Sequence, residues 1–328
     1  MRRIVFAPGE INTYGGGVEW YFQRYGDLEL HRRMISDRAR TDAFARALAE
    51  VVRPADVVLD VGTGTGVLAM LAAKAGAKQV HAVDRADIAE VARRLVRDNR
   101  LQKKVQVHQG MAADLTFPVK FDLIVSEWLG HFALVEGMLD DLCPARDRSL
   151  AEGGRMMPSE VQLMLAPVDD PVLYHRDGPG YWREPVHGLD FSGLEDVEMK
   201  QGRAAQLRVD VSSLLAPGRP LMHLDMTTVQ PADPWRKGRL VFDVVRDGVL
   251  SGFCGWFVAR LSPGVVLDTG PSHPDTHWAQ TYVPFPPRVV RAGDRLSVGF
   301  VIDRDARERR QVQLALTVER KTMRYVLE

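Results

Sequence analysis

The feature that most constrains the fold of this 328-residue chain is a glycine-rich turn that directly follows a short apolar run. The run spans residues 57–61, and the turn reads Asp60-Val61-Gly62-Thr63-Gly64-Thr65-Gly66. A bounded apolar run of this kind is typical of a parallel strand that is buried on both faces. Glycines let the backbone turn tightly and approach a ligand with no Cβ in the way. We therefore expect an α/β unit in which a strand runs straight into a ligand-binding loop.

The segments around this turn alternate between helical and strand patterns. Apolar residues at helical spacing mark three segments, at residues 40–52, 68–75 and 88–96. Short apolar runs mark three further strands, at residues 79–83, 105–108 and 121–125. Strands that alternate with helices are typical of a doubly wound parallel sheet. We therefore predict an N-terminal segment and a Rossmann-like unit over residues 1–157.

The second half of the chain has a different pattern. From about Pro158 onward, prolines and glycines are frequent and apolar residues alternate with polar ones, as in residues 222–227, 296–302 and 312–318. Such alternation predicts half-buried strands. Asp247-Gly248 lies between two apolar runs and predicts a hairpin. Several short strands favour a β-barrel or a sandwich, and we place this unit at residues 158–328.

Composition excludes some classes of partner. The formal net charge is zero, so no field of one sign would draw the chain to nucleic acid or to a membrane surface. We find no signal-peptide pattern and no apolar stretch long enough to span a membrane. Two cysteines, Cys143 and Cys254, cannot build a disulfide framework and are expected to be reduced. We expect a cytoplasmic protein with no nucleic-acid or membrane partner.

Asp84 extends the turn into a cofactor site. It follows the strand at residues 79–83 and lies 20 residues after Gly64, where a carboxylate can accept hydrogen bonds from both ribose hydroxyls. The alternative for this residue is a helix N-cap. A dehydrogenase turn would need glycine at position 67, where this chain has Val67, whereas glycine at alternate positions after an acidic residue is the methyltransferase form. We predict S-adenosylmethionine as the cofactor, bound by Asp60, Gly62, Gly64 and Asp84.

A pair of glutamates follows the last predicted strand of the first unit. Glu127 comes directly after the run at residues 121–126, and Glu136 comes nine residues later. The carboxyl ends of parallel strands face the ligand crevice, and the loop can fold Glu136 back beside Glu127. Two like charges held together are costly unless a cation lies between them. A planar guanidinium suits that place because it binds carboxylates bidentately; two solvated loop carboxylates are the alternative.

Five motifs in order now resemble the protein arginine methyltransferase family. They are Tyr21-Phe22-Gln23-Arg24-Tyr25, residues 31–41, the turn at residues 60–66, residues 126–138 and Thr276-His277-Trp278. The resemblance covers nearly the whole chain and implies a Rossmann-like domain followed by a β-barrel domain. It also implies a dimerisation arm at about residues 181–215, with Trp182, Leu189 and Phe191 as apolar contacts, and hence a homodimer.

The resemblance implies roles for individual residues. Glu127 and Glu136 would grip the substrate guanidinium, and His277 beside Asp37 would relay a proton. On the cofactor side it implies His31, Arg40 and Met138, with Arg40 on the cofactor's carboxylate. Ala113 stands where the family usually has a glutamate for adenine, so Asp114 or backbone groups would substitute. On the substrate side it implies Tyr25, Arg33, Met34 and Trp278. No metal is expected.

The identity of the acceptor is the most open question. Arg32 and Arg33 stand where many family members have acidic residues, and extra cations would repel a basic peptide. Arginine far outnumbers lysine, a bias typical of GC-rich bacterial genomes. We therefore expect free L-arginine, or a small guanidino compound with a carboxylate, as substrate. The alternatives are arginine side chains of peptides or proteins, an unrelated small molecule on the same fold, and an inert scaffold.

Overall fold

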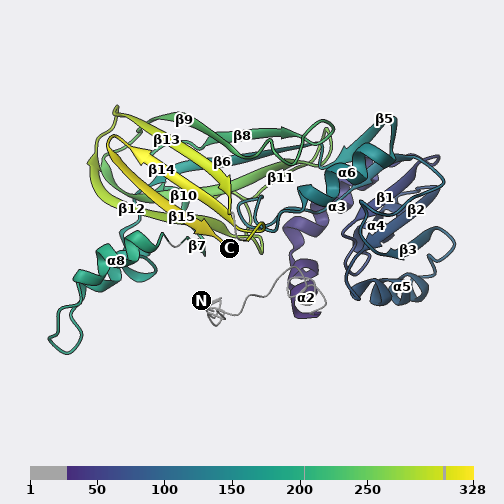
Figure 1. Cartoon of the computed structure of the whole chain (residues 1–328), viewed down its shortest axis with the longest axis horizontal. Coiled ribbons are helices and arrows are strands. Elements are labelled where there is room, and N and C mark those ends of the chain that lie inside the picture. Colours follow the sequence, from purple (N-terminus) through teal and green to yellow (C-terminus); the bar gives the residue numbers. More distant parts are fainter. Residues whose placement is uncertain (1–27, 203, 306–307) are drawn as a thin grey trace.

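The computed structural model describes residues 28–328 except 203 and 306–307, so the motif at residues 21–25, with the predicted substrate contact Tyr25, lies outside the described residues. Two units lie side by side along the long axis of the molecule (Figure 1). One contains a parallel sheet, and the other contains two antiparallel sheets. Among the described residues, no helix is long and apolar enough to cross a membrane.

The parallel sheet has the order β3-β2-β1-β4-β5 and confirms the predicted Rossmann-like arrangement. Its two central strands bear the motifs, and the apolar runs that predicted them are almost fully buried. The order reverses between β1 and β4, which is where doubly wound sheets bind ligands. The strands are β1 (Val57–Val61), β2 (Gln79–Asp84), β3 (Val105–Gln109), β4 (Phe121–Val125) and β5 (Leu150–Met157).

Helices flank this sheet and bury the faces that their apolar spacing predicts. In α5, for example, Ile88, Ala92 and Val96 recur at helical spacing and are buried. Helix α3 begins directly after Asp37, whose side chain caps it by accepting from the Arg40 amide at 2.9 Å. The helices are α2 (Leu28–Ser36), α3 (Arg38–Val51), α4 (Val67–Lys74), α5 (Ile88–Asp98) and α6 (Leu139–Ser149).

The second unit confirms the predicted β-rich, barrel-like domain. One sheet has the order β7-β12-β10-β6-β8 with β11 on β10, and the other has the order β15-β14-β13-β9. Alternate residues of their strands are buried in a core shared with the first unit. The strands are β6 (Glu160–Val168), β7 (Ala205–Leu207), β8 (Arg219–Asp225), β9 (Arg236–Asp243), β10 (Gly248–Arg260), β11 (Val266–Asp268), β12 (Gln280–Val290), β13 (Arg295–Arg304), β14 (Val312–Val318) and β15 (Lys321–Leu327).

The hairpin predicted at Asp247-Gly248 is wrong. The strands on either side of it, β9 and β10, belong to different sheets. Arg246 explains the crossing, because its guanidinium binds Asp169 at 2.9 Å and the Ser213 carbonyl at 3.1 Å. The dipeptide therefore lies where the connection from one sheet to the other ends and β10 begins.

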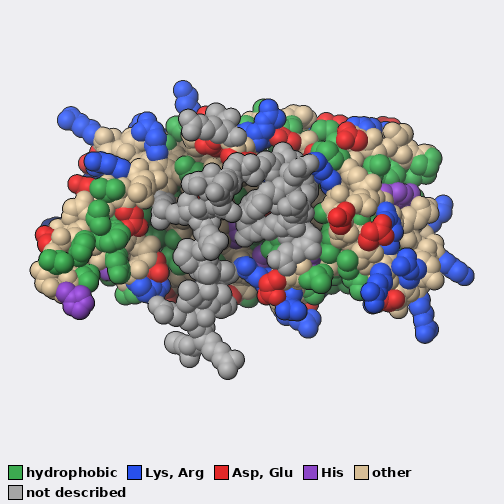
Figure 2. All heavy atoms as spheres, turned by 60° about the horizontal axis from the view of Figure 1, so that its bottom comes forward, with side chains coloured by type: hydrophobic (Ala, Val, Ile, Leu, Met, Phe, Trp, Pro, Cys, Tyr) green, Lys and Arg blue, Asp and Glu red, His purple; other side chains and the backbone are tan. Residues whose placement is uncertain are grey.

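A helical excursion leaves the β-rich unit between β6 and β8. It protrudes from the body of the molecule at the end opposite the parallel sheet (Figure 1). Hydrophobic side chains gather on the same end of the molecule in Figure 2, and Tyr181, Leu189 and Val197 are about half exposed or more. Trp182 is partly buried and donates to Glu198. The excursion comprises α7 (Pro171–Arg176), the 3₁₀ turn η1 (Pro179–Arg183), α8 (Gly193–Gln201) and, beyond β7, the 3₁₀ turn η2 (Val211–Ser213).

Candidate active site

The side chain of Asp60 stabilises the glycine turn between β1 and α4. This side chain is fully buried, and its Oδ2 accepts from Thr63 Oγ1 at 2.6 Å and from the Ala69 amide at 3.0 Å. Burial raises the pKa of Asp60 to about 7, although the hydrogen bonds from Thr63 and Ala69 oppose the rise. Asp60 therefore ties the turn to the first residues of α4 instead of facing the space above the turn.

Asp84 joins the end of β2 to the same turn. Its Oδ2 accepts from the Gly64 amide at 2.8 Å, and its Oδ1 accepts from the Ala86 amide at 2.9 Å. Burial raises the pKa of this carboxyl, against the effect of both backbone bonds. The N-cap alternative does not hold, because Asp87 occupies the cap position of α5. Asp84 thus lies at the carboxyl edge of the sheet, beside the turn.

All three glycines of the turn, Gly62, Gly64 and Gly66, have positive φ, and the first two form a cradle together with His31 and Met138. Gly62 and Gly64 have φ values of +74° and +54°. A Cβ on Gly62 would lie 3.1 Å from the Met138 methyl, and one on Gly64 would lie 2.9 Å from His31 Cε1. Side chains would therefore fill the space between the turn, the buried His31 of α2 and Met138. Ala113, which follows the end of β3, is half buried and has no polar side chain.

Glu127 lies two residues after the end of β4, and two groups bind its carboxylate. Arg40 of α3 donates to Oε2 from Nε at 3.0 Å and from Nη2 at 2.8 Å, while the Leu129 amide donates to Oε1 at 3.1 Å. The side chains of Glu127 and Arg40 are 7% and 6% exposed, so the ion pair is shielded from water. Arg40 thus binds a glutamate of the predicted clamp, and its contact with the cofactor's carboxylate stays a prediction.

The loop after Glu127 doubles back and returns Glu136 to the vicinity of its first residues. Gly130 and Ala133 form an isolated antiparallel bridge. A Cβ on Gly130 would lie 1.8 Å from the Val135 carbonyl oxygen and 3.1 Å from Glu136 Cγ, so only glycine fits. Glu136 itself has a φ of +92°, a conformation that is costly for a residue with a side chain. The fold therefore holds this glutamate in a strained conformation near the start of its own loop.

His277 and Asp37 come together although they are far apart in the sequence. Asp37 Oδ2 accepts from His277 Nδ1 at 2.8 Å and from the His277 amide at 2.8 Å. Burial alone would raise the pKa of Asp37, but the hydrogen bonds from His277 and from the Arg40 backbone outweigh it and hold the pKa below its usual value. Asp37 therefore stays ionised and orients the imidazole, with Nδ1 as donor.

The residues predicted on the substrate side differ in burial and in the groups that they contact. Trp278 is buried, and its Nε1 donates to the Leu129 carbonyl at 2.6 Å, so it supports the glutamate loop from below. Met34 and Arg33 are half buried in α2, and the Met34 carbonyl accepts from Arg40 Nη1 at 3.3 Å. The neighbouring Arg32 points into solvent, 76% exposed, and pairs with Glu29.

Sequence reasoning missed the residues that the β-rich unit contributes to the glutamate loop. Arg304 binds Asp140, which follows the loop, and the Arg310 carbonyl accepts from the Glu136 amide at 2.9 Å. Both arginines lie more than 160 positions from their partners, so no local pattern could have indicated these contacts. Within the described ranges, no group of three His, Cys, Asp or Glu side chains could hold a metal ion.

Two protein families match successive parts of the chain. Residues 39–161 match the family of the ribosomal protein L11 methyltransferase (PrmA). Residues 160–322 match the arginine methyltransferase oligomerization subdomain. The first match covers the parallel sheet, and the second covers the helical excursion and the antiparallel sheets up to the start of β15.

Curated relatives and solved structures agree with these matches. Protein arginine N-methyltransferase 1 of Schizosaccharomyces pombe is 34% identical over 80% of this chain and 78% of its own length, and that of Dictyostelium discoideum is 31% identical over 86% and 83%. The Trypanosoma brucei PRMT1 enzyme–prozyme heterotetrameric complex with AdoHcy has a TM-score of 0.85 at 29% identity over 93% of this chain and 99% of that chain. Arabidopsis thaliana protein arginine methyltransferase 10 has a TM-score of 0.84 at 29% identity, over 94% and 100%. This chain is therefore an S-adenosylmethionine-dependent arginine N-methyltransferase and belongs to the protein arginine N-methyltransferase family.

Proposed function

We propose that this enzyme methylates arginine side chains of peptides or proteins. The observation that carries the proposal is the loop that presents Glu127 and brings Glu136 back to Gly130, three residues after Glu127, with Met138 of the cradle following it. The names of the relatives support a protein acceptor over free arginine. The inert-scaffold alternative is disfavoured because the cradle, both glutamates and the His277–Asp37 pair are all present.

The cradle suits the cofactor by its shape and its polar groups. When bound, S-adenosylmethionine supplies an activated methyl group on a positively charged sulfur. We assign the space above Gly62 and Gly64 to its methionine part, between His31 and Met138. Asp84 would accept from the ribose hydroxyls with its lone pairs not used by Gly64 and Ala86. The adenine contact stays with Ala113 and its neighbours, where a glutamate is absent.

The two glutamates would hold and orient the acceptor guanidinium. Each carboxylate oxygen has lone pairs for more than one donor, so Glu127 can bind substrate while it keeps Arg40 and Leu129. Binding two nitrogens of the guanidinium leaves the third aimed at the methyl group and its lone pair available. Because the reaction is an in-line displacement, this positioning supplies much of the rate.

One proton must leave the acceptor nitrogen, since an arginine side chain is protonated at neutral pH. We propose that His277 Nε2 takes this proton, because Nδ1 already donates to Asp37 Oδ2. The ionised Asp37 would stabilise the imidazolium that forms. Trp278 and Met34 support these groups through Leu129 and Arg40.

The environment of Arg32 does not support the expectation of a small acidic substrate. That side chain is 76% exposed and pairs with Glu29, and an exposed ion pair contributes little to binding. Arg33 is the only one of the two adjacent arginines that is half buried. A repulsion strong enough to exclude basic peptides is therefore not expected from this pair.

We further propose that the helical excursion at about residues 181–215 joins two copies in a homodimer. Its exposed Leu189 and Phe191 provide apolar surface, and the family matched over residues 160–322 is described as an oligomerization subdomain. We place the boundary between the two domains at residues 157–158, between β5 and β6.

The function is tested by giving the enzyme three acceptors with isotopically labelled cofactor: an arginine-rich peptide, free L-arginine and agmatine. Mass spectrometry should find methyl groups on the arginine side chains of the peptide, with a higher kcat/KM than for either small molecule. Efficient methylation of free arginine with an unmodified peptide would overturn the protein acceptor. The Glu136→Gln variant is the matched control for background transfer.

A further inference from the structure

The described residues at the two ends of the β13–β14 connection, Arg304 and residues 309–310, contact the glutamate loop and the start of α6. At the start of this connection Arg304 donates from Nη1 to Asp140 Oδ2 and from Nη2 to Asp140 Oδ1, both at 2.9 Å. At its end the Arg310 carbonyl accepts from the Glu136 amide at 2.9 Å. These residues thus contact both sides of the segment that carries Glu136.

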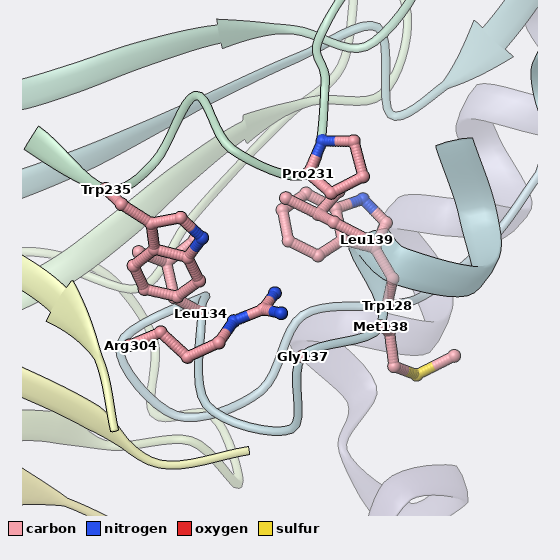
Figure 3. Close-up of a pocket in the computed structure, with 8 residues that line it drawn as sticks. All are labelled: Trp128, Leu134, Gly137, Met138, Leu139, Pro231, Trp235 and Arg304. Carbon is pink, nitrogen blue, oxygen red and sulfur yellow. The ribbon is translucent and has the colours of Figure 1, made fainter. Parts of the chain in front are cut away.

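The Arg304–Asp140 pair is built more firmly than an ordinary surface ion pair. It is bidentate, the arrangement with the best-defined geometry. The guanidinium also lies over the Trp235 ring, 5.0 Å from its centre, which adds a cation–π contact to the ion pair. Figure 3 shows Arg304 and Trp235 on one side of a small pocket and Trp128 with Leu139 on the other. The pair therefore closes the gap between β13 and the first turn of α6.

A short chain of contacts connects Asp140 to Glu136. The Asp140 amide donates to the Gly137 carbonyl at 3.3 Å, and Gly137 follows Glu136 directly. A Cβ on Gly137 would lie 3.2 Å from the Arg309 carbonyl oxygen, so the loop backbone packs closely on the turn. Since Glu136 has a φ of +92°, its conformation must be held by such surroundings.

We propose that Arg304 is a positioning residue for Glu136 and acts through Asp140. This inference rests on the proposed role of Glu136 in binding the acceptor guanidinium. Arg304 fixes the first turn of α6, the Arg310 carbonyl fixes the Glu136 amide, and the strained glutamate is held between them. Without Arg304 the backbone at residues 136–140 opens more often, and Glu136 spends less time where it can bind the acceptor.

Hydrogen exchange of the full-length enzyme tests, without substrate, whether the Arg304–Asp140 pair holds the segment that carries Glu136. In Arg304→Ala, the amides of Glu136 and Asp140 should exchange faster than in the wild type, while amides of β1 and β4 keep their rates. Arg246→Ala is the matched control, because it removes another partly exposed ion pair, with Asp169, whose two residues both lie outside the loop. Unchanged exchange at Glu136 in Arg304→Ala would overturn the proposal whatever the activity.

Kinetics then separate positioning from a general structural role. We expect kcat for an arginine-rich peptide to fall about ten- to hundredfold in Arg304→Ala, as for a misplaced reacting group, with unchanged affinity for S-adenosylhomocysteine. Arg304→Lys should recover part of the loss. Asp140→Ala should lose a similar factor, and the double variant should lose no more than either single variant, because one pair is broken in all three.

The outcomes distinguish this proposal from the proposed function. If the two single losses multiply in the double variant, or if cofactor affinity falls with kcat, Arg304 does not act through Asp140 on Glu136. If Arg304→Ala exchanged faster but kept a normal kcat, the Arg304–Asp140 pair would stabilise the backbone without positioning Glu136 for the reaction. If Glu136→Gln itself kept full activity, Glu136 would not be needed to bind the acceptor. Positioning by Arg304 would then fail as well, even if hydrogen exchange had shown that Arg304 holds the segment.

Discussion

The cofactor end and the acceptor end of this site are built in different ways. The glycine turn and its two carboxylates, Asp60 and Asp84, lie within 25 positions of one another at the ends of two neighbouring strands, and His31 and Met138 complete the cradle from other parts of the same domain. The acceptor end combines α3, the loop after β4, the loop before β12 and the β13–β14 turn. The cofactor end lies within the first domain, whereas the acceptor end needs residues of both domains.

This difference predicts that the two ends can be damaged separately. Changes in the cradle should weaken cofactor binding, and changes at the loop should reduce turnover while the cofactor still binds. A site that was a single cooperative unit would lose both properties together.

The largest expected effect is at the acceptor end, in Glu136→Gln. The substitution keeps the shape of the side chain but removes one charge from the guanidinium clamp. Turnover should fall about a hundredfold or more, as for the loss of one electrostatic contact in an active site. Steady-state kinetics with an arginine-rich peptide measure it. Near-normal turnover would remove Glu136 from the clamp.

A smaller effect is expected at the cofactor end, in Asp84→Ala. The loss of hydrogen bonds between a carboxylate and the ribose should weaken S-adenosylhomocysteine binding by about 1–3 kcal/mol. Calorimetry gives the affinity directly. Because Asp84 also accepts from the Gly64 and Ala86 amides, Asp87→Ala at the start of the next helix serves as control. Equal affinities of Asp84→Ala and wild type would place ribose binding elsewhere.

Mild acid should loosen the cofactor domain through a histidine pair on β2 and β3. His81 Nδ1 lies 3.0 Å from His108 Nε2, beside Phe117 and Phe121. Burial lowers the pKa of both imidazoles, and His108 lowers that of His81 further, so the unfolded chain binds protons first as pH falls. The contribution to stability is present above the unfolded pKa of about 6.5 and is lost below it.

Urea unfolding at pH 7.5 and at pH 5.5 measures this loss. The wild type should lose more stability between the two pH values than His108→Gln, which removes one titrating ring. An equal loss in both proteins would mean that other groups determine the acid sensitivity.

The smallest effect is expected for Arg32→Ala. Its exposed pair with Glu29 should contribute at most about 1 kcal/mol to stability, and the preference for peptide over free arginine should hardly change. Competition between the two acceptors, followed by mass spectrometry, gives the preference. A strong shift toward the peptide in the variant would restore the charge argument for a small acidic substrate.

The sequence allowed a close prediction of the cofactor end. The strands at residues 57–61 and 121–125 agree with β1 and β4 to the residue, because buried parallel strands are continuous apolar runs with sharp ends. The pairing of His277 with Asp37 also follows the resemblance to the family. Such features depend on local pattern or on shared motifs.

Contacts between domains could not be predicted in the same way. Arg304 and Asp140 are 164 positions apart, and nothing near either residue indicates the other. The binding of Arg40 to Glu127 and the burial of Trp278 depend on how α3, the glutamate loop and β12 pack together. The failed hairpin at Asp247-Gly248 also reflects a long-range contact, because Arg246 binds Asp169, which directly follows β6.

The separate construction of the two ends is tested most directly by one calorimetric comparison. S-adenosylhomocysteine is titrated into wild type, Glu136→Gln and Asp84→Ala, and turnover is measured on the same preparations. Glu136→Gln should bind like the wild type while it has lost nearly all turnover, and Asp84→Ala should bind more weakly. If Glu136→Gln binds the cofactor product as weakly as Asp84→Ala does, the two ends form one unit and this account is contradicted.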